Sequence, residues 1–549
     1  MTQVLRIVPI GGCGEVGKNM TAIEYGNDIL IIDAGIMFPE NDMLGIDFII
    51  PDWQYLRDKK ERVRAVVVTH GHEDHTGALP YLLKEIGAPL FATRLTRGLI
   101  EIKLKQHKLL DEVSLNTIAA GEALNLDPFR LEFFRVSHSI PDNVGMGITT
   151  PAGLIVHTSD FKFDHTPVDG KPTDFAKLAE FGGRGVLALL SDSTNADQPG
   201  TTPSERVIDE AFDRVFREAK GRILVGTFAS HISRVQQVAN AAMRTHRKLA
   251  LAGTSMSENV RMALKLGYLN FPDDLIVRLD EAVRMRPRET VIVATGTQGE
   301  PSSVLARVAN GQHNQIKVQR GDTMIMSSHP VPGNEEMVHR TINKLFQRGA
   351  DVLYDPIEQV HVSGHASQEE QKLMLNLVKP QHFVPVHGEL RHLNAHARLA
   401  QQVGIEPQNI AVVENGSPIE FGDGEMRVGE RVPGGYVYVD GSGVGDIGPT
   451  VLRERETLGR DGFMLAIVHR DPDSGRLLDT PELVTRGFVY TKEADELLSG
   501  ATERLVSAIE SNKRSSQEAI RDKVETTLRE YLYTETKRRP MIMAVVREA

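Results

Sequence analysis

Residues 66–80 read VVVTHGHEDHTGALP and place three histidines and one aspartate within the six positions from His70 to His75. The apolar run VRAVVV predicts a buried strand and the residues after His75 predict a helix, so the histidines occupy a tight strand-to-helix loop. In such a loop His70 and His72 can point to one side while Asp74 and His75 point to the other, which suits two adjacent metal ions. Imidazole and carboxylate donors without thiolate suit zinc or manganese in a catalytic site that admits water. A polar loop with solvent-facing histidines is the simpler interpretation, but it does not account for this density.

The composition of the chain is that of a globular protein with several domains. It has 549 residues, 40% of them hydrophobic and 25% charged, with a net charge of −11 and one cysteine, Cys13. This length predicts roughly three to four domains. No apolar run approaches the roughly 18 residues of a membrane span, and the N-terminus lacks the features of a secretory signal. A single cysteine excludes an intrachain disulfide framework and a thiolate metal site, so we expect a cytoplasmic protein with no membrane contact.

The acidic balance restricts the function classes. A net charge of −11 gives a global field that repels nucleic acid. A nucleic-acid substrate therefore requires a local basic groove, or metal ions that offset the acidic site.

The hydrophobic pattern predicts an α/β protein divided into five segments. Residues 1–204 alternate short strand-like runs with helical stretches, and residues 348–431 return to this pattern in VLYDP, FVPVHG and IAVVENG. Residues 205–347 between them read as an alternating α/β insert. A Gly-rich linker at 432–450 precedes a compact C-terminal α/β domain at 451–549.

Within these segments the pattern predicts individual elements. The insert begins with an amphipathic helix capped by Ser204, followed by the strand RILVGTF and the helix HISRVQQVANAAMRTHRK. It continues through the apolar runs LIVRL, TVIVATG and TMIMSS. The C-terminal domain has strand-like runs FMLAIVHRD, LVTRGFVY and MIMAVVRE around a charged helical region at 492–536, which reads as a solvated helix face with an oligomer or RNA contact as the alternative.

The loop at 70–75 closely resembles the metal-binding signature of the metallo-β-lactamase superfamily. The resemblance implies an αββα sandwich and three more ligands: a histidine after one strand, a bridging aspartate after another, and a histidine near the end of the fold. His138 follows LEFFRVS, Asp160 ends GLIVHTSD, and His387 ends HFVPVH. Each stands where an apolar run ends, so its position agrees with the resemblance, although each alone would more often be structural.

The resemblance also assigns these residues to two divalent ions per subunit, with zinc preferred and manganese or magnesium as alternatives. One ion takes His70, His72 and His138; the second takes Asp74, His75 and His387; Asp160 bridges them. Asp33, at the end of ILIID, resembles the superfamily's first acidic position, which braces the ligand loop.

The insert at about 205–347 resembles that of the β-CASP nuclease branch. Its further motifs are matched by Asp192 in LLSDST, His365 in HVSGHAS, and His387. In that branch a histidine at the last position goes with RNA and a valine with DNA, so the resemblance implies an RNA substrate. His365 is then the candidate general acid or contact to the scissile phosphate, and Asp192 would orient it or a neighbouring ligand.

Motifs along nearly the whole chain are together similar to the bacterial ribonuclease J family. They are GGCGEVGKNM, FPENDMLGIDFIIPD, THGHEDHTGALPYLL, SDSTNAD, FASHISR, TGTQGEP, PVPGNE, HVSGHAS, PVHGE and TRGFVY. The similarity implies a 5′-to-3′ exoribonuclease that prefers 5′-monophosphate RNA, with endonuclease activity in many members, acting in RNA maturation and mRNA decay. It also implies a single-stranded RNA substrate, a homodimer or homotetramer, and a place in an RNA-degradation complex.

Two glycine-rich stretches offer phosphate-binding alternatives. Residues 12–19, GCGEVGKN, almost form a P-loop, but Asn19 replaces the required Ser or Thr and the residues that follow are strand-like. We therefore interpret them as a turn near the active site. Residues 295–301, TGTQGEP, could be a phosphate cradle or a tight turn, and the sequence does not decide between the two.

Two further motifs are candidates for RNA binding. Ser230, His231 and Arg234 lie where a helix begins, which makes an anion site plausible, with a capped and solvated helix start as the alternative. The ribonuclease J resemblance favours RNA at that position. It also assigns the 5′-monophosphate to the loop of Ser363, His365, Ala366 and Ser367.

The mechanism implied is attack on the phosphodiester by a hydroxide held between the two metal ions, in line with the leaving group. Asp74 is essential in this scheme. Two other classes remain: a small-molecule hydrolase of the superfamily, which would not need the insert or SGHAS, and a non-catalytic RNA-binding subunit, which would normally have lost ligands. The retained insert and ligands disfavour both.

Overall fold

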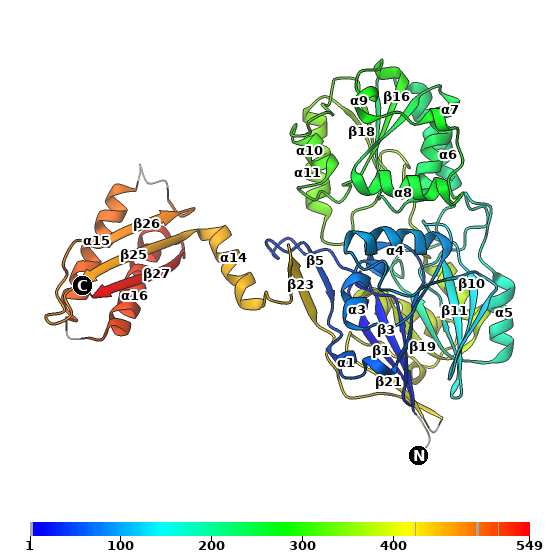
Figure 1. Cartoon of the computed structure of the whole chain (residues 1–549), viewed down its shortest axis with the longest axis horizontal. Helices are drawn as coiled ribbons and strands as arrows, with labels where there is room; N and C mark the ends of the chain where they lie inside the picture. Colours follow the sequence, from blue (N-terminus) through cyan, green and yellow to red (C-terminus); the bar gives the residue numbers. More distant parts are fainter. Residues whose placement is uncertain (1–3, 423, 490–493, 514, 549) are drawn as a thin grey trace. The chain divides into compact units, whose positions relative to one another are not determined.

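The computed structural model describes residues 4–422, 424–489, 494–513 and 515–548. They separate into two compact units (Figure 1). Unit 1 contains the residues up to Phe38 and Phe48–Val437, and unit 2 contains Pro39–Asp47 and the residues from Tyr438 onward. The last residue of the TRGFVY motif, Tyr490, and the start of the charged region at 492–536 lie outside the described residues.

Two sheets form the body of unit 1. The first has eight strands in the order β22-β21-β1-β3-β4-β6-β7-β8, and the second has six in the order β19-β13-β12-β11-β10-β9. The strands of the first sheet are β1 (Leu5–Gly11), β3 (Met20–Tyr25), β4 (Asp28–Ile32), β6 (Val63–Val68), β7 (Leu90–Thr93), β8 (Leu115–Ile118), β21 (Ile419–Gly422) and β22 (Glu425–Val428). Those of the second are β9 (Ala123–Leu126), β10 (Phe129–Arg135), β11 (Val144–Thr150), β12 (Gly153–His157), β13 (Val186–Asp192) and β19 (Pro380–Val386).

The core of this sandwich lies between the two sheets. Ile7 and Val67 of the first sheet share one buried cluster with Phe133, Ile155 and Val384 of the second. Phe134, next along β10, points to the opposite face and packs in another cluster with residues of α5 (Phe175–Arg184) and α12 (Gln368–Val378). This alternation follows from the period of two along a strand, so the second sheet is buried on both faces.

Helices complete the layers. The parallel strands β6, β7 and β8 are joined by α3 (Leu79–Glu85) and α4 (Arg94–Gln106), and α13 (Leu390–Gln402) follows β19. The αββα sandwich implied by the sequence is thus confirmed. Shorter elements of this body are β2 (Cys13–Gly14), β5 (Phe48–Pro51), α1 (Gln54–Arg57), α2 (Glu73–Thr76) and β20 (Gly388–Glu389).

The insert is a five-stranded sheet in which all pairings are parallel, in the order β15-β16-β14-β17-β18. Its strands are β14 (Ile223–Gly226), β15 (Lys248–Ala252), β16 (Thr290–Ala294), β17 (Thr323–Met326) and β18 (Asp351–Leu353). Because β18 belongs to it, this sheet extends past residue 347, where the insert was expected to end. Its helices are α6 (Arg206–Glu218), α7 (Ile232–Arg244), α8 (Thr254–Lys265), α9 (Leu279–Ala282), α10 (Val304–Ala309) and α11 (Glu335–Gln347).

Both faces of the inserted sheet are buried. Ile223 and Val225 pack with α6, α7 and α8, whereas Leu224 between them packs with α10 and α11. The insert therefore has two hydrophobic cores, as expected for a parallel sheet with helices on both sides.

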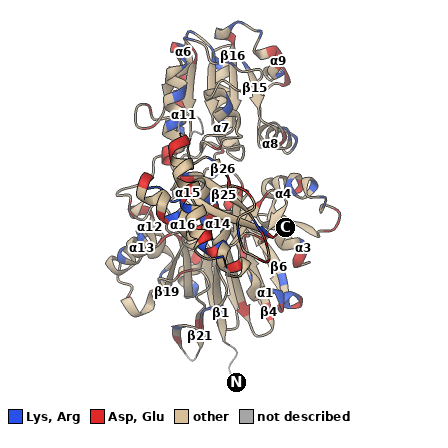
Figure 2. Cartoon of the chain, turned by 90° about the vertical axis from the view of Figure 1, so that its left-hand side faces the viewer, with Lys and Arg blue, Asp and Glu red and all other residues tan. Residues whose placement is uncertain are grey.

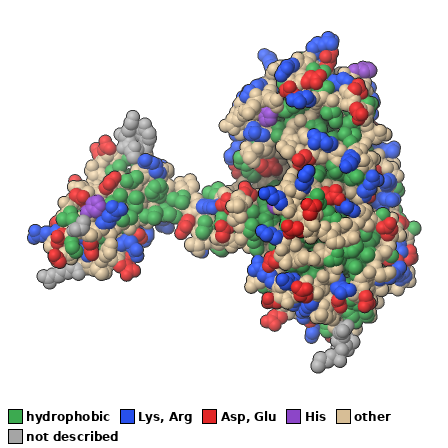
Figure 3. All heavy atoms as spheres, viewed as in Figure 1, with side chains coloured by type: hydrophobic (Ala, Val, Ile, Leu, Met, Phe, Trp, Pro, Cys, Tyr) green, Lys and Arg blue, Asp and Glu red, His purple; other side chains and the backbone are tan. Residues whose placement is uncertain are grey.

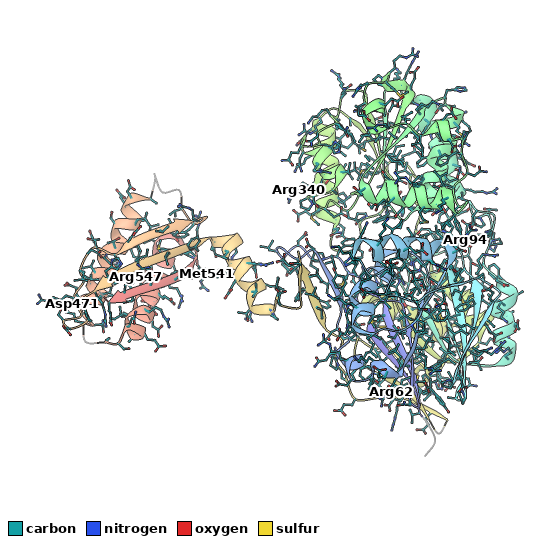
Figure 4. All side chains as sticks on the ribbon, in the orientation of Figure 1. Arg62, Arg94, Arg340, Asp471, Met541 and Arg547 are labelled. Atoms are coloured by element: carbon teal, nitrogen blue, oxygen red, sulfur yellow. The ribbon has the colours of Figure 1, made fainter. Side chains whose placement is uncertain are left out.

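Unit 2 has its own small core. Strand β25 (Phe463–Arg470) pairs antiparallel with β26 (Glu482–Arg486) and parallel with β27 (Met541–Glu548). Helices α15 (Asp495–Glu510) and α16 (Gln517–Thr536) bury Leu505, Leu528 and Leu532 against this sheet. Figure 4 shows Met541 and Arg547 on β27. The unit also contains α14 (Pro449–Asp461).

Three local expectations are wrong, and a fourth is met in part. Helix α6 begins at Arg206 with Glu205 as its N-cap, but the Ser204 hydroxyl still accepts a hydrogen bond of 3.2 Å from the Arg206 backbone N–H and also bonds Thr166. The run LIVRL is not a strand: a 3₁₀ turn ends at Leu275, Ile276 makes one isolated bridge, and α9 starts at Leu279. The run IAVVENG likewise has one isolated bridge, at Ile410. The expected linker at 432–450 contains the strands β23 (Tyr436–Asp440) and β24 (Gly443–Val444).

The surface carries mixed charge. Residues of both charges occur on α6 (Figure 2), and charged and hydrophobic side chains are interspersed on the face of unit 1 drawn in Figure 3. Among the described residues, no helix has both the length and the apolar character to cross a membrane.

Candidate metal centre

Strand β6 and the single-turn helix α2 position the histidine loop. His70 follows the buried end of β6, and His72 is the N-cap of α2 with an extended backbone. The ring nitrogens His70 Nε2 and His72 Nδ1 are 3.1 Å apart, and His138 Nε2 is also 3.1 Å from His72 Nδ1. With Asp160, these three histidines form one group whose ligating atoms all lie within 4.8 Å of one another.

A second group of the same kind contains Asp74, His75, Asp160 and His387. His75 Nε2 is 3.2 Å from Asp160 Oδ2, and His387 Nδ1 is 3.0 Å from Asp160 Oδ1. His387 Nε2 is buried and has no hydrogen-bond partner among the described residues, which leaves it available as a donor to a metal. Asp160 is therefore shared between two converging sets of nitrogen and oxygen atoms, as a bridging ligand must be.

The donor set fits divalent metal ions. Burial lowers the pKa of His72 to about 4 and of His138 to about 3, and His365 beside them adds to the effect, so both are neutral at pH 7, the form that binds a metal. Burial opposes charge on His75 and His387 as well, but the Asp160 carboxylate outweighs it and raises their pKa. Several buried carboxylates thus converge where a cation is needed to balance them.

Backbone strain accompanies the site. Asp33, Ser159 and His387 are non-glycine residues with φ of 61°, 60° and 54°. Left-handed conformations of this kind cost about 1–3 kcal/mol each and cluster at functional sites. They turn the chain sharply where β4, β12 and β19 end, which brings the strand ends together.

Asp33 braces the loop, as the sequence predicts. Its Oδ1 accepts a hydrogen bond of 2.8 Å from the Thr69 backbone N–H, and its Oδ2 lies 2.8 Å from His75 Nδ1. The carboxylate therefore fixes the orientation of the His75 ring and directs Nε2 toward Asp160.

Sequence reasoning missed other supporting residues. Asn19 donates through Nδ2 to the Asp74 backbone carbonyl at 3.2 Å, with its Nδ2 also 3.2 Å from His75 Nε2. Asn143 donates to the Asp160 carbonyl at 2.6 Å. Asn19 belongs to the P-loop-like stretch, which forms a turn between β2 and β3 beside the site, as expected.

Asp192 and His365 lie beside the second group. His365 Nδ1 is 2.7 Å from Asp192 Oδ2, and Asp192 Oδ1 accepts hydrogen bonds from the backbone and hydroxyl of Thr194 at 2.9 and 2.8 Å. Burial opposes the charged form of His365, but Asp192 outweighs it and raises the pKa of the ring. Asp160, Asp192, His365 and His387 form a third group within 4.8 Å.

The loop of Ser363, His365, Ala366 and Ser367 is held from several sides. Ser363 Oγ accepts a hydrogen bond of 2.8 Å from Asn195 Nδ2, and Ser367 is the N-cap of α12 in a capping box with Glu370. The Gly364 carbonyl, within the same loop, lies 2.8 Å from His138 Nδ1. The loop and the histidine cluster are thus joined directly.

The structure separates the three residues predicted at the start of α7. Ser230 is half-buried, and His231 is a buried N-cap whose pKa is lowered by burial, by Arg234 and by His72 and His138. Arg234 is fully buried and binds within the protein instead. Its guanidinium donates to Glu205 at 2.6 Å, the Val360 carbonyl at 2.7 Å, Gln237 at 2.8 Å, and Ser327.

The TGTQGEP stretch forms a tight turn in the described structure. Gly296 and Gly299 have φ of 102° and 81°, and Gln298 donates to the His329 carbonyl at 2.9 Å and accepts from the Val331 N–H at 2.7 Å. The Thr297 hydroxyl is buried and has no hydrogen-bond partner among the described residues. The packing of the turn favours a structural role.

Comparison with known proteins gives matches along the whole chain. Family models match as follows: "Metallo-beta-lactamase superfamily" at 13–169, "Ribonuclease J, beta-CASP domain" at 220–345, "Zn-dependent metallo-hydrolase RNA specificity domain" at 349–410, and "Ribonuclease J C-terminal domain" at 450–549. Ribonuclease J2 of Bacillus subtilis is 41% identical over 100% of this chain and 99% of its own. Ribonuclease J 1 of Streptococcus pyogenes is 43% identical over 98% of this chain and 97% of its own. A solved structure of a protein of unknown function from Enterococcus faecalis V583 covers 76% of this chain and 100% of its own, with a TM-score of 0.54 and 15% identity, which is a likeness of fold.

Proposed function

We propose that this chain, which belongs to the ribonuclease J family and is a metal-dependent ribonuclease that binds RNA, is a 5′-to-3′ exoribonuclease that prefers 5′-monophosphate RNA. The observation that carries the proposal is the contact between the two parts of the site. The Gly364 carbonyl, in the loop assigned to the 5′-phosphate, lies 2.8 Å from Nδ1 of the candidate ligand His138. A bound 5′ end would therefore lie close to the cleavage site, which favours removal of terminal nucleotides.

Two divalent ions complete the site in this proposal, with zinc preferred and manganese or magnesium as alternatives. One ion would be held by His70, His72 and His138. The other would be held by Asp74, His75 and His387, and Asp160 would contribute to both sites. When bound, the ions lower the pKa of water and stabilise charge on the phosphate oxygens. Asp33 and Asn19 keep the ligands in place around them.

His365 is the proposed general acid, which protonates the leaving oxygen of the phosphodiester. The Asp192 carboxylate holds its Nδ1 at 2.7 Å, so Nε2 is left to face the substrate. Because Asp192 raises the pKa of the ring, His365 carries a proton near neutral pH and donates it from Nε2 to the leaving oxygen. Asp192 is a positioning residue that keeps the ring charged and aligned.

RNA contacts come from two loops. Ser363, His365, Ala366 and Ser367 receive the terminal phosphate, at the loop that leads into α12. Ser230, which is half-buried, contacts the strand nearby. His231 and Arg234 are buried behind it, and Arg234 bonds Glu205 instead of meeting the phosphate itself.

The remaining parts of the proposal rest on the resemblance to the family. They are a single-stranded substrate, a homodimer or homotetramer, an RNA-degradation complex as the setting, a cytoplasmic location, and endonuclease activity as a second mode. The division of the chain into segments at 1–204, 205–347, 348–431, 432–450 and 451–549 is proposed from the hydrophobic pattern, with the inserted sheet extended to β18 and the strands β23 and β24 inside the linker segment.

A matched set of single strands tests the proposal: 5′-monophosphate RNA, 5′-triphosphate RNA and DNA of one sequence. Metal-loaded protein is expected to convert the first to mononucleotides, and Asp74→Ala is expected to be inactive while retaining its fold. Asp111→Ala, an exposed aspartate outside the site, serves as the matched control and is expected to be fully active. Internal cuts that ignore the 5′ end would contradict the exonuclease assignment, and unchanged turnover of Asp74→Ala would contradict the two-metal scheme.

A further inference from the structure

A second cavity lies in the inserted domain, apart from the metal centre. Its volume is about 490 Å³, which is within the range of small-molecule sites. The lining residues come from the turn after β15 and from α8, α9 and α10. It opens at the carboxyl end of the parallel strands β15 and β16, the edge at which α/β sheets bind ligands.

Two guanidinium groups face this cavity without a carboxylate partner. Arg261 has no ion pair or hydrogen bond in the part of the chain that the structure describes. Arg307 makes one long hydrogen bond of 3.4 Å, from Nε to the Ser303 carbonyl in its own helix. Both side chains belong to exposed residues, so both are free to turn toward an anion.

A buried histidine supplies a third donor. His313 is only 8% exposed, and its Nδ1 accepts hydrogen bonds from the backbone N–H groups of Gln315 and Ile316 at 3.2 and 3.0 Å. These bonds place the proton of the neutral ring on Nε2. The side chain lines the cavity, so Nε2 is the ring nitrogen that can donate to a ligand there. A fixed N–H donor at the cavity wall suits a ligand with an acceptor.

The other walls suit a sugar and a base. Glu258 is the one acidic residue of the lining, and its Oε2 already accepts a hydrogen bond of 3.0 Å from Gln106, which leaves Oε1 for a hydroxyl. Leu279 and Val304 provide apolar surface. The cavity is larger than a phosphate alone would fill.

We propose that this cavity binds a ribonucleotide, with Arg261, Arg307 and His313 on its phosphate, Glu258 on its ribose hydroxyls, and Leu279 and Val304 against its base. The nucleotide is either a free mononucleotide or one unit of an RNA strand. The site is distinct from the metal centre: β15 is separated from β14 by β16, and at about 4.8 Å per strand its end lies roughly 10 Å from the end of β14, which leads to His231.

The first test measures binding of labelled AMP to the metal-loaded full chain by equilibrium dialysis. Wild type is expected to bind one more equivalent of AMP than the Arg261→Ala,Arg307→Ala double variant, and each single substitution is expected to weaken this site about tenfold to a hundredfold. Arg288→Ala is the matched control. Arg288 is exposed, has no ion pair among the described residues and precedes β16, at the other end of the strand.

A second arm identifies the source of the nucleotide with an RNA that has phosphorothioate linkages, which resists cleavage and keeps its 2′-hydroxyls, and measures its binding by fluorescence anisotropy. Loss of AMP binding alone in the arginine variants identifies a free mononucleotide. Loss of RNA affinity, with or without loss of AMP, identifies a unit of the strand. Variants that match wild type and Arg288→Ala in both arms would overturn the proposal.

Discussion

The buried ion pair between Glu205 and Arg234 allows a quantitative test of how the start of α7 works. Arg234 is fully buried, Glu205 is 3% exposed, and their charged atoms are 2.6 Å apart. Lys162, also fully buried, lies 3.5 Å from the other oxygen of Glu205. Replacing Glu205 with Gln keeps the shape but leaves two buried cations without an anion, which costs about 3–5 kcal/mol of unfolding free energy.

An exposed ion pair with the same N–O distance joins the same two helices, α6 and α7. Asp213 of α6 and Arg244 of α7 are 2.6 Å apart with side chains 37% and 47% exposed. Asp213→Asn is therefore expected to cost about 0.2–1 kcal/mol, because solvent screens this pair. Because the two ion pairs have the same N–O distance, the difference between their unfolding free energies reports the effect of burial.

Urea unfolding of wild type and both variants at pH 7 gives the two free energies. Hydrogen exchange of peptides from α6 and α7 should follow the transition, since the chain has several cores and its one tryptophan, Trp53, lies in the sandwich. A cost below about 1 kcal/mol for Glu205→Gln, similar to that of Asp213→Asn, would refute the reasoning.

The pH dependence of this effect has a defined sign. Burial opposes ionisation of Glu205, but Arg234 and Lys162 outweigh it, so the pKa of Glu205 is lowered in the folded protein. A lowered pKa stabilises the fold at pH values above the unfolded pKa of about 4.3, and this contribution is lost as the pH falls through the folded pKa. The difference between wild type and Glu205→Gln is therefore largest near pH 7 and narrows below about pH 4.

Three further outcomes are expected. Asn19→Ala removes the hydrogen bonds that hold Asp74 and His75, and should weaken metal binding about 10-fold to 100-fold in competition with a chelating indicator; unchanged affinity would exclude this role. Chelation of the metal should abolish RNA cleavage and lower the thermal midpoint, with zinc or manganese restoring both, because the buried carboxylates around Asp160 lose their cations; an unchanged midpoint would count against a buried centre. Burial raises the pKa of Cys13 to about 12, so iodoacetamide at pH 8 should label it only after denaturation; rapid labelling of the native protein would show that the thiol is accessible.

The sequence predicted the centre best where the signal was local. The loop from His70 to His75 stands out because ligating residues are dense and a strand precedes them. His138, Asp160 and His387 needed the family resemblance, since a single polar residue at the end of a strand has many explanations. Asn19 and Asn143 were not predictable, because an amide that holds a ligand through its backbone carbonyl leaves no distinctive pattern.

The local errors in the fold have tertiary causes. Ser204 stands one residue before the N-cap Glu205, and its hydroxyl bonds both the Arg206 backbone N–H and Thr166, which is distant in sequence. The run LIVRL contains β-branched residues, which favour a strand. However, only Ile276 forms a bridge to Leu249 of β15, and α9 begins at Leu279, before a second bridge can form. Arg234 resembled an exposed anion-binding residue, and only the three-dimensional structure reveals the buried Glu205 beside it.

The order of the site residues along the chain has a consequence during synthesis. The first sheet places β1 beside β21, and the candidate ligands extend from His70 to His387, so the site draws on both ends of the sandwich. A ribosome that adds about 5–20 residues per second takes roughly 16 to 63 seconds to pass from His70 to His387. During that time the growing polypeptide has an incomplete set of the proposed ligands. The proposed metal centre can therefore form only after most of the sandwich has been synthesised.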